Sequence, residues 1–192
     1  LKSASLGRIR GYAVFFSALT LLVSILMFTG LPEPLRKAVP FFNQYQHFSP
    51  QDNIRFNLPP EQYKWITIQF GEYQSLSVNW NVGVDGLSLP LVILSSCLFF
   101  FATLWALSRK EQIRQFFGLL FLLQVGVGGV FCSLDFILFY LFWELMLLPM
   151  YFLISGFGKE RVAAQRAAIK FFLYTMAGSV FFLISAIAMK VL

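Results

Sequence analysis

Five long runs of apolar residues divide the chain, and the stretches between them are short or rich in polar residues. The runs cover residues 11–31, 84–107, 116–132, 135–155 and 163–189. A helix needs about 20 consecutive apolar residues to cross the hydrocarbon core of a bilayer, with a lower limit of about 17. We therefore expect five transmembrane helices, of which the third is the shortest. The pattern predicts an all-α integral membrane protein in which residues 1–192 belong to one membrane domain.

Composition agrees with this class. Hydrophobic residues make up 58% of the chain and charged residues only 12%, whereas soluble domains contain about 25% charged residues. A net charge of +6 could indicate a nucleic-acid partner, but the basic residues lie in segments between apolar runs, as in membrane topology signals. We therefore exclude nucleic acid and expect the lipid bilayer as the surroundings. Cys97 and Cys132, in or at the edge of apolar runs, are interpreted as small buried hydrophobes without metal-ligand spacing.

The distribution of basic residues predicts the orientation. With the N-terminus on the cytoplasmic side, ten basic residues face inward: Lys2, Arg8, Arg10, Arg109, Lys110, Arg114, Lys159, Arg161, Arg166 and Lys170. Four fall in the outer loop: Arg36, Lys37, Arg55 and Lys64. Basic residues are enriched on the cytoplasmic side of membrane proteins. The excess therefore favours an N-terminus inside and the long 31–83 loop outside.

The 31–83 loop changes character along its length. Prolines dominate its first part and disfavour regular structure there. Residues 63–70 and 76–84 are rich in β-formers, with Gly71 and Glu72 between them. This alternation predicts a β-hairpin on the outer side of the membrane. Such a hairpin would either cap the helix ends or contact a neighbouring subunit.

One carboxylate interrupts the fourth apolar run. Glu144 lies nine residues after Asp135, which is about 13 Å along a helix and well inside a hydrocarbon core about 30 Å thick. An ionised side chain at that depth costs at least about 2.5–3.5 kcal/mol, so it marks a candidate functional site. Pro149 lies one turn further on and deprives the Leu145 carbonyl of its helical donor. The buried acid and a backbone defect are therefore neighbours.

Three other polar residues allow two interpretations each. Asp85 and Asp135 precede apolar runs and are predicted to cap helices through backbone N–H groups, although each could also serve the functional site. Gln124, near the middle of the third run, is either an interhelical hydrogen-bonding residue or part of a proton path. The same run contains Gly118, Gly126, Gly128 and Gly129, which allow helices to approach closely.

The fifth run carries small residues on one face. They are Ala164, Ala168, Thr175 and Ser179, with Gly178 beside them. Residues spaced four apart share a helix face, so this face is predicted to pack on other helices. Lys170 lies about two turns from the basic end. Its side chain either snorkels to the interface or is a buried cation that acts with Glu144.

Three stretches together carry a family resemblance. They read VDGLSLPLVIL (84–94), DFILFYLFWELMLLPMYFLI (135–154) and AAIKFFLYTMAGS (167–179). In these stretches the chain resembles antiporter-like subunit 4 of complex I, the M-type subunit of bacteria and the D-type of cyanobacteria and chloroplasts. The sequence before 84–94, with the hairpin, is most similar to the cyanobacterial D-type. Subunits of Mrp-type Na⁺/H⁺ antiporters and energy-converting hydrogenases share the same core.

The resemblance implies a larger fold. The family has about fourteen helices in two inverted halves, and this chain would be an N-terminal part holding its second to sixth helices. Glu144 matches the family's essential glutamate, whose lysine partner would lie beyond Leu192. Lys170 matches a lysine at the start of the sixth helix, and we assign it only a weak candidate role. The missing initiator methionine and first helix lead us to expect a native polypeptide about two to three times longer.

Two functions remain open on these observations. The resemblance implies a proton-translocating subunit of a redox-driven oxidoreductase that transfers electrons from NAD(P)H or ferredoxin to a quinone, such as an NADH:plastoquinone oxidoreductase. The chain has no dinucleotide fingerprint and no cysteine run for iron–sulfur clusters, so cofactors and quinone are expected in partner subunits, and no metal in this one. The expected location is a cyanobacterial thylakoid or bacterial plasma membrane. The same resemblance also allows a subunit of a multi-subunit Na⁺/H⁺ antiporter or of an energy-converting hydrogenase. The function of a different class is a non-pumping structural membrane scaffold in which Glu144 only helps packing.

Overall fold

The computed structural model describes residues 2–29, 64–70, 74–84, 86–109 and 112–191. Its helices are α1 (Lys2–Thr29), α3 (Ser88–Ala106), α4 (Ile113–Cys132), α5 (Phe136–Phe157) and α6 (Arg161–Val191). Strands β1 (Lys64–Phe70) and β2 (Gln74–Asn79) precede α3. All five helices contain a segment long and apolar enough to cross a membrane. The prediction of five membrane helices is confirmed.

Two helices are longer than the sequence predicted. The third span begins at Ile113 and has 20 residues, so it is not the shortest; α3, with 19 residues, is. Helix α1 begins nine residues before the predicted start at residue 11. Both extensions contain arginines (Arg8, Arg10 and Arg114), which lower the local hydropathy without breaking a helix. Their long side chains can reach water from the first turns of a membrane helix.

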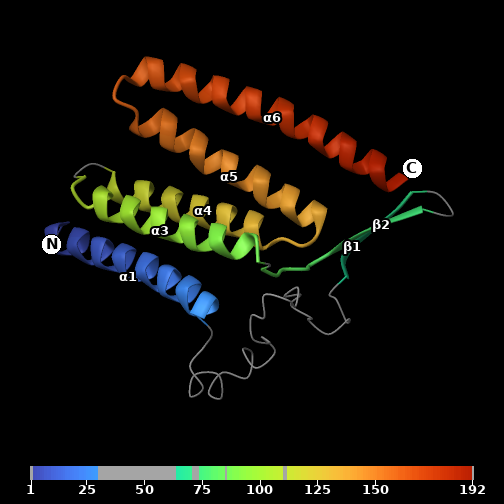
Figure 1. Ribbon diagram of the computed structural model, residues 1–192. Coiled ribbons are helices and arrows are strands. Elements are labelled where there is room, and N and C mark those ends of the chain that lie inside the picture. Colours follow the sequence, from blue (N-terminus) through green and yellow to red (C-terminus); the bar gives the residue numbers. More distant parts are fainter. Residues whose placement is uncertain (1, 30–63, 71–73, 85, 110–111, 192) are drawn as a thin grey trace.

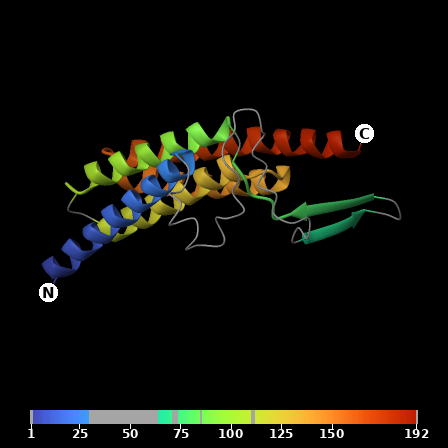
Figure 2. The same cartoon turned by 60° about the horizontal axis from the view of Figure 1, so that its bottom comes forward.

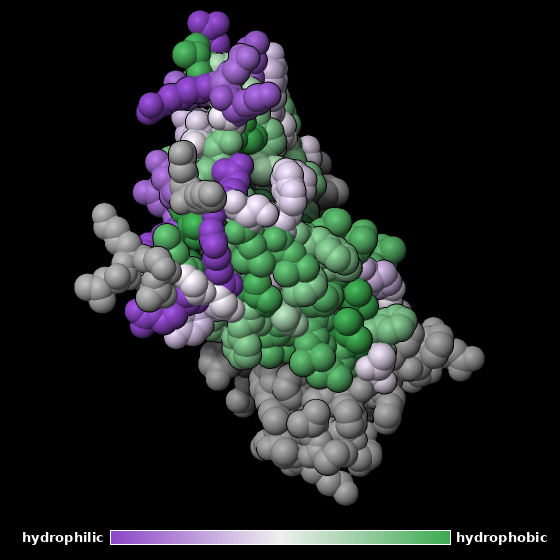
Figure 3. Space-filling model, turned by 90° about the vertical axis from the view of Figure 1, so that its left-hand side faces the viewer, coloured by the Kyte–Doolittle hydropathy of each residue, from purple (hydrophilic) through white to green (hydrophobic). Residues whose placement is uncertain are grey.

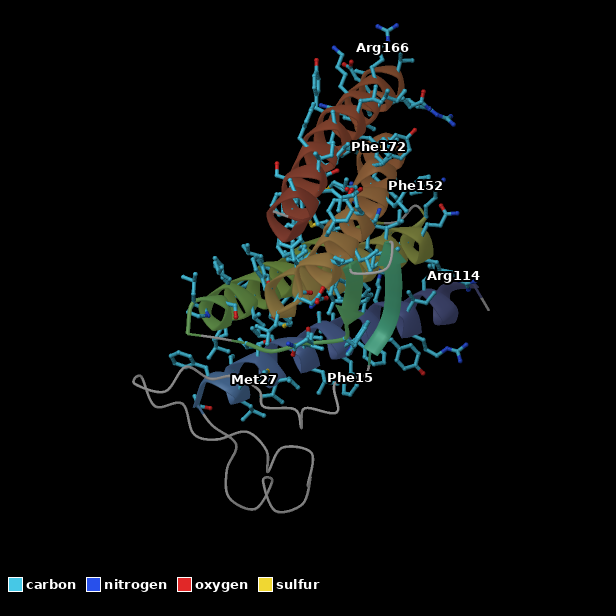
Figure 4. The ribbon with its side chains drawn as sticks, turned by 90° about the vertical axis from the view of Figure 1, so that its right-hand side faces the viewer. Phe15, Met27, Arg114, Phe152, Arg166 and Phe172 are labelled. Atoms are coloured by element: carbon cyan, nitrogen blue, oxygen red, sulfur yellow. The ribbon has the colours of Figure 1, made fainter. Side chains whose placement is uncertain are left out.

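The helices form an open row rather than a closed bundle. Each helix packs mainly on the next one in sequence, α1 on α3, α3 on α4, α4 on α5 and α5 on α6. Figure 1 shows this row from α1 at the bottom to α6 at the top, with successive helices running in opposite directions. Many apolar side chains are therefore exposed, as membrane helices require. Phe15 is 60% exposed and lies on the outer side of α1 in Figure 4.

The basic segments gather at one end of the row. This end holds the start of α1, the α3–α4 connection and the α5–α6 connection (Figure 1). The guanidinium Nη2 of Arg10 donates a hydrogen bond to the Arg109 carbonyl at 2.7 Å and so joins α1 to the α3–α4 connection. A small core beneath it contains Ala13, Ala106 and Phe117. The structure thus places at one end the segments that the charge pattern assigned to one side of the membrane.

A β-hairpin lies at the opposite end. Strands β1 and β2 pair in antiparallel fashion, with Thr67 opposite Ser77, and extend beyond the ends of the helices in Figure 2. Gly71 and Glu72, where the turn was predicted, fall outside the described residues. Strand β2 ends at Asn79, although the sequence predicted a strand as far as residue 84. The strand is shorter than predicted because the backbone after Asn79 forms hydrogen bonds with another segment of the chain and not with β1.

That segment is the turn between α4 and α5. Gly83 N donates to the Cys132 carbonyl at 2.7 Å, and Leu134 N donates to the Asn81 carbonyl at 3.0 Å. The ring of Trp80 also meets the ring of Phe142 edge-on, with centroids 6.3 Å apart. Backbone groups at a membrane surface need such partners. The segment that leads into α3 therefore covers the three-residue turn from which α5 starts.

Candidate functional site

Helix α5 begins with a side-chain cap. Asp135 has an extended backbone, and its Oδ1 accepts hydrogen bonds from Ile137 N at 2.9 Å and Leu138 N at 3.2 Å. The first N–H groups of a helix have no backbone partner within it, and a carboxylate at this position satisfies them. The capping interpretation of Asp135 is confirmed. Asp85, for which the same role was predicted, lies outside the described residues.

We expect Asp135→Ala to lower the free energy of unfolding by about 1 kcal/mol, because it removes an N-cap acceptor. Asp135→Asn keeps an acceptor oxygen and removes the charge, so it should retain most of the stability. Thermal unfolding of the two variants in one detergent checks this expectation. If Asn were as destabilising as Ala, the charge of Asp135 rather than its hydrogen bonds would matter.

Glycines on α4 set how closely α5 packs. A Cβ atom on Gly126 would come within 2.9 Å of Met146 Cβ and 3.2 Å of the Met146 backbone. A Cβ atom on Gly129 would collide with the ring of Phe142. Gly118 and Gly128, in contrast, have open space where a side chain would be. Close approach of α4 and α5 is thus confirmed for two of the four predicted glycines.

Pro149 lies inside α5, fully buried. Because proline has no N–H, the carbonyl of Leu145 lacks the donor that a regular helix would supply. Membrane helices tolerate such a defect where neighbouring groups can satisfy the free carbonyl. The helix continues past Pro149 to Phe157, so the polar defect lies within the span, one residue from Glu144.

Glu144 is the ninth of the 22 residues of α5 and therefore lies near the middle of the span. Its side chain is partly buried. Its Oε1 atom is buried and has no hydrogen-bond partner among the described residues. Buried polar atoms are nearly always paired, so an unpaired carboxyl oxygen needs an explanation such as a functional role or a missing partner.

The surroundings of Glu144 include groups from α5 and α6. The phenol of Tyr140, one turn earlier on α5, lies close enough to interact with the side chains of both Glu144 and Ser179. The hydroxyl of Ser179 donates to the Met176 carbonyl at 2.9 Å, and that of Thr175 donates to the Phe171 carbonyl at 2.6 Å. Each hydroxyl has one proton to donate, so both α6 hydroxyls use their proton within their own helix, and Tyr140 connects Ser179 to Glu144.

Lys170 does not join this group. Aromatic contacts fix the antiparallel register of α5 and α6, with Phe136 stacked on Phe182 (4.8 Å between ring centroids) and Tyr151 against Phe172 (5.9 Å). Lys170 lies five residues before Thr175, about 7.5 Å along the helix toward the basic end, and its side chain is exposed. The structure thus places Lys170 on the outside of α6, as an exposed cation.

The small-residue face of α6 packs largely as predicted. Ala168 is fully buried and Ser179 is 4% exposed, while Gly178 is exposed. Ala164, in the first turn of α6, lies against Gly158. A Cβ atom added to Gly158 would collide with the Ala164 side chain. Helices α5 and α6 can therefore approach closely, with the hydroxyl of Tyr140 on α5 within reach of Ser179.

A second polar group connects α1, α3 and α4. Gln124 Nε2 donates to Thr20 Oγ1 at 2.8 Å, and the hydroxyls of Ser24 and Ser96 are 2.8 Å apart. The predicted interhelical contact of Gln124 is confirmed, while its own Oε1 is buried without a partner. Thr20, Ser24 and Ser96 were not predicted from the sequence. The spacing of Ser17, Thr20 and Ser24 on one face of α1 was the available signal.

The described residues contain no group of three or more His, Cys, Asp or Glu side chains that could hold a metal ion. Cys97 and Cys132 are free and partly buried. Within the described part of the chain, the chemistry available near mid-membrane is that of Glu144, Tyr140 and the hydroxyl and amide groups around them. Such groups can hold and pass protons.

Comparison with known proteins gives a family match for the last part of the chain. Residues 133–191, which include Asp135, Glu144, Pro149 and Lys170, match the family described as NADH:quinone oxidoreductase/Mrp antiporter, transmembrane. This region consists of α5 and α6 with the turn before them.

Similarity to individual proteins extends over most of the chain. NAD(P)H-quinone oxidoreductase chain 4 3 of Picosynechococcus sp. is 39% identical over 149 residues, which cover 78% of this chain and 25% of that protein. The chloroplastic chain 4 of Chaetosphaeridium globosum is 41% identical over 130 residues (67% and 24%). F(420)H(2) dehydrogenase subunit M of Methanosarcina mazei is 38% identical over 125 residues (65% and 23%). The chain thus spans about a quarter of the length of these relatives.

Proposed function

Because the chain has the sequence features of an antiporter-like subunit 4 of complex I type, we propose that it is a proton-translocating membrane subunit of an NAD(P)H- or ferredoxin-dependent quinone oxidoreductase. In this proposal Glu144 is the side chain that takes up and releases the proton. The other parts of the complex carry out the redox reaction. The chain is an integral membrane protein with five candidate spans.

The observation that carries the proposal is the unpaired oxygen of Glu144. A carboxyl group near the middle of a membrane helix is costly unless it has a function or a partner. The cap at Asp135 fixes where α5 starts, and the close packing at Gly126 fixes its distance from α4. These contacts set the position of Glu144, while its Oε1 has no hydrogen-bond partner in the described part of the chain.

The surroundings also suggest how a proton could be held and passed. A protonated carboxyl can donate to an acceptor, and a carboxylate can only accept. The hydroxyl of Ser179, whose proton is used on its own helix, and the free carbonyl of Leu145 offer acceptors. Tyr140 offers a hydroxyl between Glu144 and Ser179. A carboxyl group releases its proton more readily when a cation approaches it, so in this proposal movement of a cation drives the exchange.

The test is proton translocation by sealed vesicles that contain the complete complex, with and without the carboxyl group of Glu144. The proposal requires substrate-driven acidification of the vesicle lumen in the parent protein and its loss when the carboxyl is replaced by an amide. Retained acidification would support the scaffold function instead.

An Na⁺/H⁺ antiporter subunit is the second candidate, favoured by one observation. The family that matches residues 133–191 includes Mrp antiporters as well as quinone oxidoreductases. The two functions differ in their driving force. Replacing Na⁺ by choline abolishes proton movement in an antiporter and leaves substrate-driven pumping unchanged. The same measurement distinguishes H⁺ from Na⁺ as the coupled ion.

We further propose that the basic end of the row is cytoplasmic and that the hairpin end faces the opposite side, the lumen of a thylakoid or the periplasm. A single cysteine at Gln51, in a background without Cys97 and Cys132, should react with a membrane-impermeant maleimide only from the outer side. A cysteine at Lys159, in the α5–α6 connection, is the matched control and should react only from the inner side. The opposite pattern would reverse the orientation.

A further inference from the structure

A groove opens at the basic end of the row between α3, α4, α5 and α6. Its volume is about 900 Å³. The rim carries Arg109 and Lys159 with Glu160 beside them, and the walls include Trp105, Phe116 and Ala167. Figure 3 looks onto this end of the molecule and shows hydrophilic side chains at the top and along one edge, next to a broad apolar area.

The membrane-spanning region next to this groove is also hollowed. A second groove of about 540 Å³ lies among the same four helices. Its lining residues Ala102, Leu120 and Phe171 follow Ala106, Phe116 and Ala167 of the first groove at a distance of one helical turn. The deeper part is lined by aliphatic, aromatic and methionine side chains, with Ser95 as its polar residue. A charged rim therefore lies about one helical turn from an apolar groove among the same four helices.

We propose that this groove binds one anionic phospholipid, with its phosphate at Arg109 and Lys159 and an acyl chain between α3 and α6. The site has the two-part chemistry of such a lipid, cations at the interface and hydrocarbon beneath. It is independent of Glu144 and of proton translocation.

The side chain of Arg109 packs against two aromatic rings at the rim. Its guanidinium carbon lies 4.8 Å from the ring centroid of Phe116 and 5.3 Å from that of Phe157. Its carbonyl is held by Arg10 at 2.7 Å. No ion pair with a carboxylate is found for Arg109 or Lys159 within the described ranges, although Glu160 lies on the same rim. A fixed guanidinium with free donors is well suited to a phosphate.

Trp105 marks the level of the site in the membrane. Its side chain is 84% exposed and lies on the rim of the groove. Tryptophan is enriched at the depth of lipid headgroups, where the indole ring meets both hydrocarbon and water. The phosphate position at Arg109 is thus at the expected depth for a headgroup.

The chemistry favours a lipid over a further protein helix. A membrane helix is about 10 Å wide and apolar along its length, so it would leave the two cations of the rim with only one carboxylate, that of Glu160, as counter-charge. An acyl chain is narrow, and the anionic headgroup attached to it supplies that charge. Basic residues at a membrane surface attract anionic lipids by about 1 kcal/mol each, which corresponds to about five-fold in binding.

The experiment uses the complete protein in its complex, reconstituted into phosphatidylcholine vesicles that contain a small fraction of phosphatidylglycerol with a photoreactive acyl chain. After illumination, peptide mass spectrometry maps the adducts. We expect adducts on the deeper groove, at Leu98, Ala102 and Leu120, and few from photoreactive phosphatidylcholine. Arg109→Gln should reduce the phosphatidylglycerol adducts about five-fold. Arg166→Gln, which removes a charge of the same end outside the groove (Figure 4), should leave them unchanged.

Two further variants guard against a folding defect. Lys159→Gln changes an exposed side chain of the same rim and should give a loss similar to that of Arg109→Gln. Ala167→Phe fills the groove without changing charge and should reduce adducts from both lipids. The proposal fails if the deeper groove gives no lipid adducts and instead cross-links to another segment of protein. It also fails if both lipids label equally, or if Arg166→Gln has the effect of Arg109→Gln.

Discussion

Replacing Glu144 by Gln is expected to leave the complex assembled and to reduce proton pumping on the order of a hundred-fold, the scale typical of a lost proton-transferring group. Glutamine has nearly the same volume and forms hydrogen bonds, but its amide cannot release a proton at physiological pH. Glu144 is partly buried, and one of its oxygens has no partner among the residues that the structure describes. The amide therefore leaves the packing unchanged. The measurement is acidification of sealed vesicles, with quinone reduction followed in parallel.

Glu144→Asp is the matched control for the carboxyl group. Aspartate still titrates, but its carboxyl lies one methylene short of the position near Tyr140 and Ser179. We therefore expect partial activity, between that of the parent and of the Gln variant. Normal pumping by Glu144→Gln would favour the scaffold function. Equal loss in both variants, with normal assembly, would show that position rather than titration is critical.

Gly126→Ala is expected to destabilise the packing of α4 on α5 by about 1–3 kcal/mol, the typical cost of overpacking. The new Cβ would lie 2.9 Å from Met146 Cβ and 3.2 Å from the Met146 backbone. Because backbone atoms cannot rotate away, α5 must move. Met146 is two residues from Glu144, so proton pumping should fall together with the thermal unfolding midpoint.

Gly128→Ala is the internal control on the same helix, since no atom lies within 4 Å of its added Cβ. It should leave both the midpoint and the pumping rate close to those of the parent. If Gly126→Ala and Gly128→Ala behaved alike, the close approach of α4 and α5 would not determine the position of Glu144.

Local chemistry explains what could be predicted from the sequence. The cap of α5 depends on a carboxylate two and three residues before its donors, and this contact does not require knowledge of the rest of the fold. The depth of Glu144 follows from the length of one apolar run. The packing of Gly126 and Ala168 follows from their small size within a membrane helix. Each inference used residues of a single helix.

Contacts between distant segments could not be predicted in this way. The pairing of Gly83 with Cys132 joins residues almost 50 positions apart, and no pattern in either segment identifies the other. The bond between Ser24 and Ser96 is of the same kind. The groove at the basic end is formed by four helices, and only the basic residues of its rim were noted in the sequence. Helix bounds at Ile113 and Lys2 were missed because arginines interrupt the apolar pattern there.

The central claim is that the carboxyl group of Glu144 gains and loses a proton during turnover. Infrared difference spectroscopy of the reconstituted complex, between its resting and substrate-reduced states, measures this directly through the carbonyl stretch of a protonated carboxylic acid. We predict a carboxylic-acid band that changes with turnover in the parent protein, is absent from Glu144→Gln and is shifted in Glu144→Asp. A turnover-dependent band that persists unchanged in Glu144→Gln would contradict the account, because the proton would then reside on another group.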